Sequence, residues 1–460
     1  MSTGDINLEV SVALTQFVAN GCWDAIPAPV RHEAKRALLN FFAVSMAGCD
    51  DPTLTIATRV LGQFAANQQA SLIGRSERSD ILNASALNAM SANVFDFDDT
   101  HMPTIIHPTA PIAPVVFALA ESATTSGRDL LTAFILGVEV ACRIGNAISP
   151  GHYVRGWHIT STCGIFGSAM AAGKVLRLDA TNLKWALGHA SSQASGLVET
   201  IGTMAKSAGV GAAARNGLLS ALLAQQGFTG PDFPLEGERG FLRVTDDVPE
   251  IARIVSGLGD RWEILRNTYK PYPCGVVLNP VIEACLDIAH RPGVTKDDLA
   301  DISEIEITGH PLLRQRADRP EVLTGREAQV SAQHAVAVSL LYGKAGLAQF
   351  SDHAVADSAV RTLSKKVRFI DDACTPLAAA RLRLLRSDGQ MITATVETAR
   401  GSVDKPMSDH ELENKLREVC GTSAAGYDPE PLIAAIWSLD ENRDAGALMA
   451  LTSIGRNNTH

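Results

Sequence analysis

Residues 127–148 read GRDLLTAFILGVEVACRIGNAI, and this stretch decides the fold class that the sequence predicts. Its apolar residues recur at the spacing that places them along one side of an α-helix. That side comprises Leu130, Leu131, Phe134, Ile135, Val138 and Cys142. The remaining positions are mostly apolar too, so we expect a helix that is buried on most of its faces. A helix of this kind needs other helices around it, which predicts a helix bundle.

A second stretch, TCGIFGSAMAAGKVL at residues 162–176, is typical of a helix at the centre of such a bundle. Its small residues Gly164, Gly167, Ala171 and Ala172 permit neighbouring helices to approach closely. From residue 5 to about residue 265, Ala and Leu are frequent and strand-like alternation is rare. Gly or Pro interrupts the pattern roughly every 15 to 25 residues, as expected for successive helices. We therefore predict that this part of the chain is helical.

The pattern changes near Lys270, where residues 269–280, YKPYPCGVVLNP, contain three prolines and predict a loop or the start of a helix. Residues 301–310 then predict a strand. Residues 381–398 predict a hairpin around an Asp388-Gly389 turn. The alternating apolar positions of this hairpin are Leu382, Leu384, Ile392, Ala394 and Val396. This region therefore mixes strands with helices.

A helix resumes in KPMSDHELENKLREV at residues 405–419, where Ser408 and Glu411 occupy capping-box positions. We therefore expect a mainly α fold, in which the chain returns to the helical part at its end. The large all-helical domain is predicted to comprise residues 1–268 and 402–460. Residues 269–401 are predicted to form a smaller α+β lid domain.

The composition is that of a globular protein, with 46% hydrophobic and 20% charged residues among 460. The formal net charge of -10 argues against a nucleic-acid partner or an anionic membrane, because both bind clustered positive charge. An anionic small molecule stays possible, since a few local Lys, Arg and His residues can hold it. The sequence contains no run of about 18 uninterrupted apolar residues, so we expect no membrane span.

The cysteines and the N-terminus both indicate a cytoplasmic protein. The eight cysteines are scattered without any C-x-x-C pair, which fits reduced thiols better than disulfides, zinc or an iron–sulfur cluster. The first residues contain acids where a signal peptide would have basic residues, and no small-residue cleavage site follows. We expect mature sequence from the start of the chain.

The segment NVFDFDDTHMPTIIH at residues 93–107 crowds three aspartates and two histidines together, and three interpretations stay open. Its acids could chelate Mg²⁺ for diphosphate chemistry, although residues 102–106 offer no further acid about one helical turn later. Its short polar residues could instead cap helices before Pro103 and Pro108. In the third interpretation, a carboxylate orients an imidazole for proton transfer.

Three later segments contain further candidates. In HYVRGWHITSTCG, residues 152–164, His158 precedes a helix start, where anions bind favourably. In TMAKSAGVGAAARNG, residues 203–217, Lys206 precedes glycines, but no strand comes before it as a dinucleotide loop would require. In YKPYPC, Lys270 lies at the predicted domain junction, a common place for ligands. Each also has a structural alternative, because single histidines are often core residues and lysines often face water.

Taken together and in order, four motifs resemble those of the MmgE/PrpD family. They are DFDDTH…HPTAPIAPVVFALAE, RGWHITSTCGIFGSAMAAGK, GTMAKSAGVGAAARNG and YKPYPC. The family includes 2-methylcitrate dehydratase, cis-aconitate decarboxylase and iminodisuccinate epimerase, and the resemblance runs from about residue 8 to residue 440. It implies a large all-helical domain built from both chain ends, a smaller α+β lid domain and a homodimer.

The resemblance also implies a set of site residues and an activity without a redox cofactor or a metal. The residues at the family's active-site positions are Asp96, Thr100, His107, His158, Lys206 and Lys270. Lys206 and Lys270 would bind carboxylates, His107 and His158 would move protons, and Thr100 would hydrogen-bond the substrate. Asp96 would orient a histidine or raise its pKa. Asp98 and Asp99 would cap helices or hold the loop.

The implied function is a cofactor-independent lyase acting on a small di- or tricarboxylate by proton transfer next to a carboxylate. A hydro-lyase similar to 2-methylcitrate dehydratase is our first expectation. A decarboxylase similar to cis-aconitate decarboxylase and an epimerase similar to iminodisuccinate epimerase are the alternatives. A Mg²⁺-dependent diphosphate lyase and a carboxylate-binding protein without turnover are more distant ones.

Overall fold

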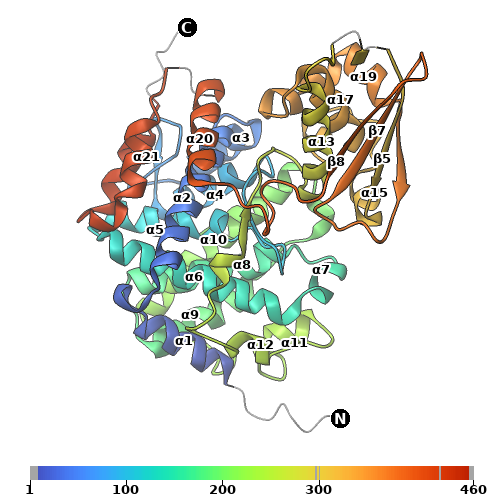
Figure 1. Cartoon of the computed structure of the whole chain (residues 1–460). Coiled ribbons are helices and arrows are strands. Elements are labelled where there is room, and N and C mark those ends of the chain that lie inside the picture. The colour runs from blue at the N-terminus through green and yellow to red at the C-terminus, as the bar shows by residue number, and fades with distance from the viewer. Residues whose placement is uncertain (1–8, 296–297, 300, 424–425, 455–460) are drawn as a thin grey trace. The chain divides into compact units, whose positions relative to one another are not determined.

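The computed structural model describes residues 9–295, 298–299, 301–423 and 426–454, and they form two compact units (Figure 1). The helical unit comprises the described residues within Met1–Val94, Asp98–Asn267 and Asp409–His460. The α+β unit comprises Phe95–Phe97 and Thr268–Ser408. The predicted fold class, a large helical part and a smaller α+β part, is confirmed.

The helical unit is built from α-helices with a few strands of two or three residues. Its helices are α1 (Val10–Asn20), α2 (Ala28–Gly48), α3 (Pro52–Leu61), α4 (Ile81–Asn93), α5 (Thr109–Ser122), α6 (Gly127–Ile148), α7 (Gly151–Val154), α8 (Ile159–Val175), α9 (Ala180–Gln193), α10 (Met204–Gln225), α11 (Phe241–Thr245), α12 (Ala252–Val255), α20 (Asp409–Ser423) and α21 (Glu430–Trp437). Its strands are β1 (Ala70–Ser71), β2 (Arg78–Ser79) and β3 (Asp99–His101). The chain's last helices therefore join its first ones in a single helical unit.

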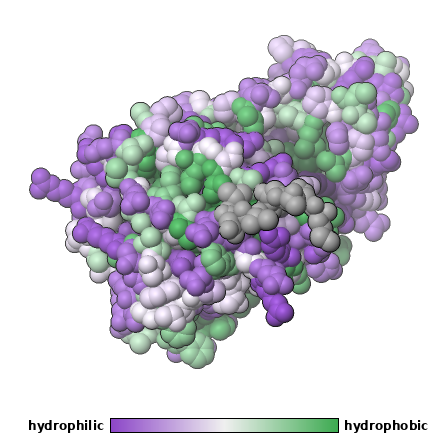
Figure 2. Space-filling model, turned by 90° about the horizontal axis from the view of Figure 1, so that it is seen from below, coloured by the Kyte–Doolittle hydropathy of each residue, from purple (hydrophilic) through white to green (hydrophobic). Residues whose placement is uncertain are grey.

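Helix α6 is the core helix that the sequence predicts, with the same bounds. By length and composition it could cross a membrane, but all of its apolar window is buried inside the protein. Its surroundings are other helices, as Figure 1 shows. The face of the molecule seen in Figure 2 is mostly hydrophilic, with apolar side chains in smaller patches, as is usual for globular proteins.

Glycines bring α6 and α8 into close contact. A Cβ atom added at Gly167 of α8 would lie 2.7 Å from the carbonyl oxygen of Gly137 in α6. A Cβ atom added at Gly137 would lie 2.7 Å from the carbonyl oxygen of Gly167. Only residues without a Cβ atom allow two backbones to approach so closely. The close approach predicted for residues 162–176 is confirmed, and its partner is the helix at residues 127–148.

The α+β unit contains one four-stranded sheet in the order β6-β5-β7-β8. Its strands are β5 (Ile302–Gly309), β6 (Val367–Asp371), β7 (Ala380–Arg386) and β8 (Met391–Val396). Strand β5 pairs parallel with β6 and antiparallel with β7, and β7 pairs antiparallel with β8. The register places Leu382 opposite Ala394 and Leu384 opposite Ile392, so the predicted hairpin is confirmed. A β-bulge after Ile302 explains why the apolar residues of β5 alternate imperfectly.

The unit also contains the helices α13 (Asn279–Ala289), α15 (Pro311–Ala317), α16 (Gly325–Ala328), α17 (Ala332–Tyr342), α18 (Asp352–Ala356) and α19 (Ser358–Ser364). Figure 1 shows α13 and α17 along one side of the sheet. Helix α13 packs on β7 and β8, and α17 packs on α13. A continuous apolar core of this unit results, which includes Ile305, Ile307, Leu382 and Leu384.

His152 of α7 gives the helical unit a predicted dependence on pH. Its ring is buried, stacks on Trp157 and lies with Nε2 2.8 Å from the Thr162 hydroxyl. Burial lowers the pKa of His152 from 6.5 to about 4. The unfolded chain therefore takes up a proton below pH 6.5 that the folded chain does not take up until about pH 4. We expect this group to lower the free energy of unfolding by about 3 kcal/mol as the pH falls through that window.

The measurement is urea unfolding of His152→Gln and of the unmodified protein between pH 7 and pH 4. Glutamine cannot titrate, so the stability of the variant should fall less steeply on acidification. His353→Gln is the control because His353 lies exposed in α18, and it should keep the slope of the unmodified protein. Equal slopes for His152→Gln and the unmodified protein would contradict the prediction.

Candidate active site

The loop between α4 and α5 contains three aspartates and two histidines and makes a tight turn. The N–H of His101 donates to the carbonyl of Ile106 at 2.8 Å, and the N–H of Ile105 donates to the carbonyl of His101 at 2.8 Å. Ile105 has a φ of 58°, in the left-handed region that β-branched residues rarely adopt. This strained turn brings the two ends of the loop together, with Thr100 Oγ1 3.3 Å from His107 Nδ1.

The environment of His107 fixes which of its ring nitrogens bears the proton. Nδ1 lies 2.6 Å from the backbone carbonyl oxygen of Asp99, which can only accept a hydrogen bond. Nδ1 of the neutral ring must therefore be protonated, and Nε2 is the nitrogen that can take a proton. Asp98 Oδ1 lies 3.4 Å from the same Nδ1.

Asp98 and Asp99 have different tasks in this loop. Asp99 is fully buried and accepts hydrogen bonds from the Thr109 hydroxyl at 2.5 Å and from Asn267 Nδ2 at 2.8 Å. Burial raises the pKa of Asp99 to about 7, against the opposing effect of the Thr109 hydrogen bond. Asp99 thus holds the loop to the start of α5, as the sequence suggested. Asp98 accepts from Asn93 Nδ2 at 2.7 Å and lies beside His107, a placement that the sequence did not indicate.

His158 lies at the start of α8. Its Nδ1 is 2.8 Å from the hydroxyl of Ser161, and its backbone N–H donates to the carbonyl of Gly196 at 2.9 Å. Gly196 has a φ of 142°, and a Cβ atom there would lie 2.6 Å from Cβ of Ser161. The glycine therefore lets this segment lie directly against the first turn of α8.

Lys206 lies in the first turn of α10, behind the helix cap formed by Thr203. Its side chain is buried, with 9% of the residue's surface exposed. Burying an ammonium group is costly unless charged or polar groups accompany it. Lys206 therefore contributes positive charge at the N-terminal end of α10.

The packing of α8 against α10 places these residues at one end of the helical unit. Gly209 of α10 lies against Ser161 of α8, and Gly217 lies against Ser168, so the two helices run in the same direction. Their N-terminal ends, which bear His158 and Lys206, therefore lie together. His107 is fixed to the same end, because its backbone N–H donates to Thr160 Oγ1 at 3.1 Å. Helix N-termini favour anions, which adds to the positive potential of this region.

Asp96 and Lys270 belong to the α+β unit, where they pair with each other. Lys270 is buried, and its Nζ donates to the carbonyl oxygen of Asp96 at 2.8 Å and lies 3.2 Å from Asp96 Oδ2. Asp96 has a φ of 51°, which is also in the left-handed region. Two residues that lie 174 positions apart in the chain are thus held together within this unit.

The six predicted residues therefore fall into two sets. Thr100, His107, His158 and Lys206 lie in the helical unit, where the loop and the two helix ends converge. The other two form the ion pair of the α+β unit. Two imidazoles near a buried ammonium group can bind a carboxylate and transfer a proton next to it. Sequence reasoning missed Asp98 beside His107, and it missed a buried histidine–glutamate pair behind the loop, described below.

Comparisons with known proteins match the chain to one family over most of its length. The MmgE/PrpD N-terminal domain matches residues 12–253, and the MmgE/PrpD C-terminal domain matches residues 272–440. A cis-aconitate decarboxylase-like protein of Aspergillus oryzae is 28% identical over 453 residues, covering 93% of this chain and 94% of the relative. Cis-aconitate decarboxylase of Aspergillus terreus is 28% identical over 470 residues, with coverages of 96% and 95%. Cis-aconitate decarboxylase of Mus musculus is 27% identical over 437 residues, with coverages of 91% and 88%.

Proposed function

The chain belongs to the MmgE/PrpD family and is an enzyme of the lyase class, and on this basis we propose that it acts on a small di- or tricarboxylate by proton transfer next to a carboxylate. The observation that carries this proposal is the convergence of His107, His158 and Lys206 at the N-terminal end of α8 and α10. Positive charge there would bind the substrate and stabilise a carbanion-like state. The reaction would need no redox cofactor and no metal.

In the proposed mechanism, Lys206 binds one substrate carboxylate, assisted by the partial positive charge at the two helix ends. His107 exchanges a proton through Nε2, because Nδ1 is committed to the Asp99 carbonyl. His158 is the second acid–base group, and Thr100 hydrogen-bonds the substrate. Lys270 is proposed as a second carboxylate-binding cation. Asp96 is proposed to orient a histidine or to raise its pKa.

Decarboxylation of a cis-aconitate-like tricarboxylate is the first specific proposal, because the relatives reported above are named for that reaction. The carbon–carbon bond to the leaving carboxylate breaks, CO₂ departs, and the electron pair spreads into the neighbouring carboxylate. A histidinium then returns one proton to carbon. The negative charge of this state is proposed to develop beside Lys206 and the N-terminal ends of α8 and α10.

Loss of water from a 2-methylcitrate-like substrate is the second specific proposal. It requires a base to remove the proton next to a carboxylate and an acid to protonate the leaving hydroxyl. The presence of two imidazoles, His107 and His158, in one region supports it. An epimerase similar to iminodisuccinate epimerase would use the same two groups on opposite faces of the substrate.

The organisation of the protein is proposed on the same basis. We take residues 1–268 with 402–460 as one functional domain and residues 269–401 as the other. We also propose that the protein is a homodimer in the cytoplasm. The eight cysteines support the location, because all of them are free thiols.

The test is proton NMR in D₂O of the purified protein with cis-aconitate, 2-methylcitrate, citrate and iminodisuccinate. We expect one of the four to be converted, with deuterium entering the carbon next to a carboxylate. The identity of the product separates loss of CO₂, loss of water and epimerisation. Conversion that stops with EDTA and returns with Mg²⁺ would favour metal-dependent chemistry instead. A folded protein that leaves all four compounds unchanged would contradict the proposed substrate class.

A further inference from the structure

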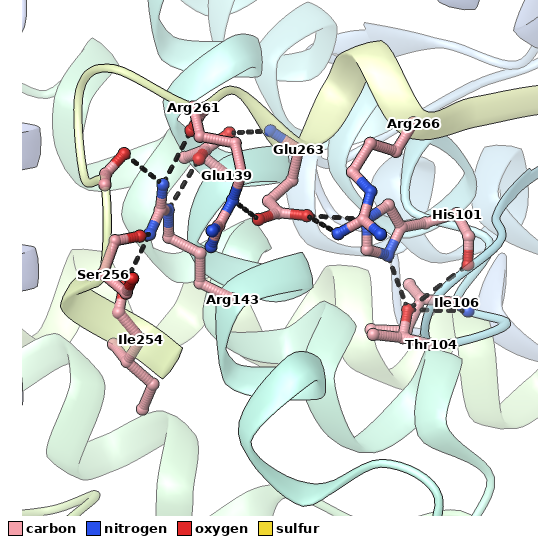
Figure 3. A network of polar contacts seen from close by, with 11 residues as sticks. His101, Thr104, Ile106, Glu139, Arg143, Ile254, Ser256, Arg261, Glu263 and Arg266 are labelled. Carbon is pink, nitrogen blue, oxygen red and sulfur yellow. Dashed lines mark hydrogen bonds and ion pairs between the residues drawn. The ribbon is translucent and has the colours of Figure 1, made fainter. Parts of the chain in front are cut away.

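A buried chain of hydrogen bonds runs behind the loop of residues 98–107 (Figure 3). His101 is fully buried, with Nε2 3.0 Å from Glu263 Oε2 and Nδ1 2.8 Å from Thr104 Oγ1. The backbone N–H of Ile106 donates to Thr104 Oγ1 at 3.3 Å. The chain thus leads from Glu263 to the residue immediately before His107.

The direction of each hydrogen bond follows from what its neighbour can do. The Thr104 hydroxyl accepts from Ile106, and its own hydrogen can go to the His101 carbonyl at 3.5 Å or to Nδ1 of His101 at 2.8 Å, where the shorter distance favours Nδ1. Nδ1 is then an acceptor, and the neutral ring bears its proton on Nε2 and donates it to Glu263. Burial lowers the pKa of His101, which agrees with a neutral ring. Every hydrogen bond of the chain therefore points towards the Glu263 carboxylate, and the bonds polarise one another.

Glu263 itself is firmly anchored. Nε of Arg261 lies 3.1 Å from one carboxylate oxygen, and Arg266 lies 3.3 Å from the other. The backbone N–H of Glu263 donates to Glu139 Oε2 at 2.8 Å. Burial acts to raise the pKa of Glu263, but the hydrogen bonds that it accepts, first that from His101, hold it well below its usual range. The carboxylate is therefore ionised and is the fixed end of the chain.

A second buried charge fixes the segment that contains Glu263. Arg143 of α6 bonds Glu139 at 2.6 Å, and neither side chain is exposed. Its other N–H groups donate to four backbone carbonyls, those of Ile254, Ser256, Gly257 and Arg261. Figure 3 shows Arg143 on one side of Glu263 and His101 on the other. The loop is thus tied to the rigid core helix of the unit.

We infer that Glu263 and His101 are positioning residues, which act through Thr104 to hold His107 in a single tautomer at the candidate site. The left-handed conformation of Ile105 is energetically unfavourable for a β-branched residue, so hydrogen bonds within the loop are needed to maintain it. The hydrogen bond from Ile106 to Thr104 adds to the backbone hydrogen bonds of the turn, at the residue immediately before His107. The inference rests on the proposed function in one respect, namely that His107 transfers a proton in the reaction.

The decisive variant is Thr104→Val, which keeps the shape of the side chain and removes the hydroxyl from the chain of hydrogen bonds. We expect the loop to relax, the hydrogen bond from His107 Nδ1 to the Asp99 carbonyl to weaken, and both tautomers of His107 to be populated. Turnover of the substrate found in the panel should fall by about 10- to 100-fold, with KM changed much less. Thr104→Ser retains the hydroxyl and should restore both properties.

Thr132→Val is the matched control. Thr132 is also a buried threonine, and its hydroxyl bonds the Arg128 carbonyl at 2.7 Å within α6, outside the loop. Both valine variants remove one buried threonine hydroxyl, but Thr104→Val also leaves the Ile106 N–H and Nδ1 of His101 without their partner and should lose more stability. Only Thr104→Val should alter His107.

The readout is ¹⁵N NMR of protein labelled in histidine, with the His107 signals assigned by their loss in His107→Asn. A single Nδ1-protonated tautomer is expected in the unmodified protein and in Thr104→Ser, and a mixture in Thr104→Val. An unchanged tautomer in Thr104→Val would overturn the inference whatever the rate. A changed tautomer with unchanged turnover would support the positioning of His107. It would also show that His107 does not transfer the proton in the proposed mechanism.

Discussion

His107→Asn lowers turnover by about 10²- to 10⁴-fold, which is the contribution expected of a positioned acid–base group. Asparagine is the sharpest replacement because its Nδ2 can still donate to the carbonyl of Asp99, as Nδ1 of the imidazole does. The loop should therefore keep its conformation while the group that exchanges protons at Nε2 is removed. The structural restraint and the chemical function of the ring are thus separated in one variant.

The measurement is the initial rate of product formation by NMR, together with deuterium uptake from D₂O. We expect KM to change less than the rate, because the proposed binding charge is on Lys206 and Lys270. His353→Asn on the exposed surface of α18 is the control and should leave the rate unchanged. A His107→Asn protein that retains the native rate would exclude His107 as the proton-transfer group.

Gly167→Ala destabilises the helical unit although alanine is the better helix former. The added Cβ atom would lie 2.6 Å from Ile112 Cδ1, 2.7 Å from the carbonyl oxygen of Gly137 and 2.9 Å from Ala141 Cβ. The side chain of Ile112 can turn away, but the backbone of Gly137 can move only with its helix. We expect α6 and α8 to separate slightly, with a loss of about 1–3 kcal/mol in the free energy of unfolding.

Gly421→Ala is the matched control, since Gly421 lies exposed in α20 and, among the described residues, no atom would come within 4 Å of its new Cβ atom. Here the intrinsic preference of alanine acts alone and should stabilise the protein by up to about 1 kcal/mol. The two substitutions are chemically identical, so any difference between them reports the space around each glycine. We expect effects of opposite sign in urea unfolding. A stabilising Gly167→Ala would show that α6 and α8 are packed less tightly than their glycines indicate.

The sequence predicted those features that depend on local pattern. The periodicity of residues 127–148 gave a buried helix with the observed bounds, and alternation about Asp388-Gly389 gave a hairpin with the observed pairing. Both patterns arise within a few turns or strands, where the spacing of apolar residues reports directly on the buried side. Three of the family motifs similarly pointed to a loop and two helix starts, which lie together within the helical unit.

The features that the sequence did not predict depend either on contacts between distant residues or on the exact path of the backbone in a turn. Glu263 meets His101 across 162 positions, and neither residue stands in a recognisable motif. Asp98 and Asp99 are adjacent and chemically identical, yet one lies beside His107 and the other fixes the start of α5. Their different tasks follow from the direction in which each side chain leaves the strained turn, and composition contains no signal for that direction.

The assignment of Phe95–Phe97 to the α+β unit has a consequence for recombining members of this family. The three residues are separated from the rest of their unit by the whole stretch from Asp98 to Asn267. A chimera that exchanges only the contiguous block 268–408 would inherit Lys270 from one parent and Asp96 from the other. The ion pair between them would then be a hybrid of two lineages. Exchanging the complete α+β unit between two parents therefore requires two separate grafts, the second only three residues long.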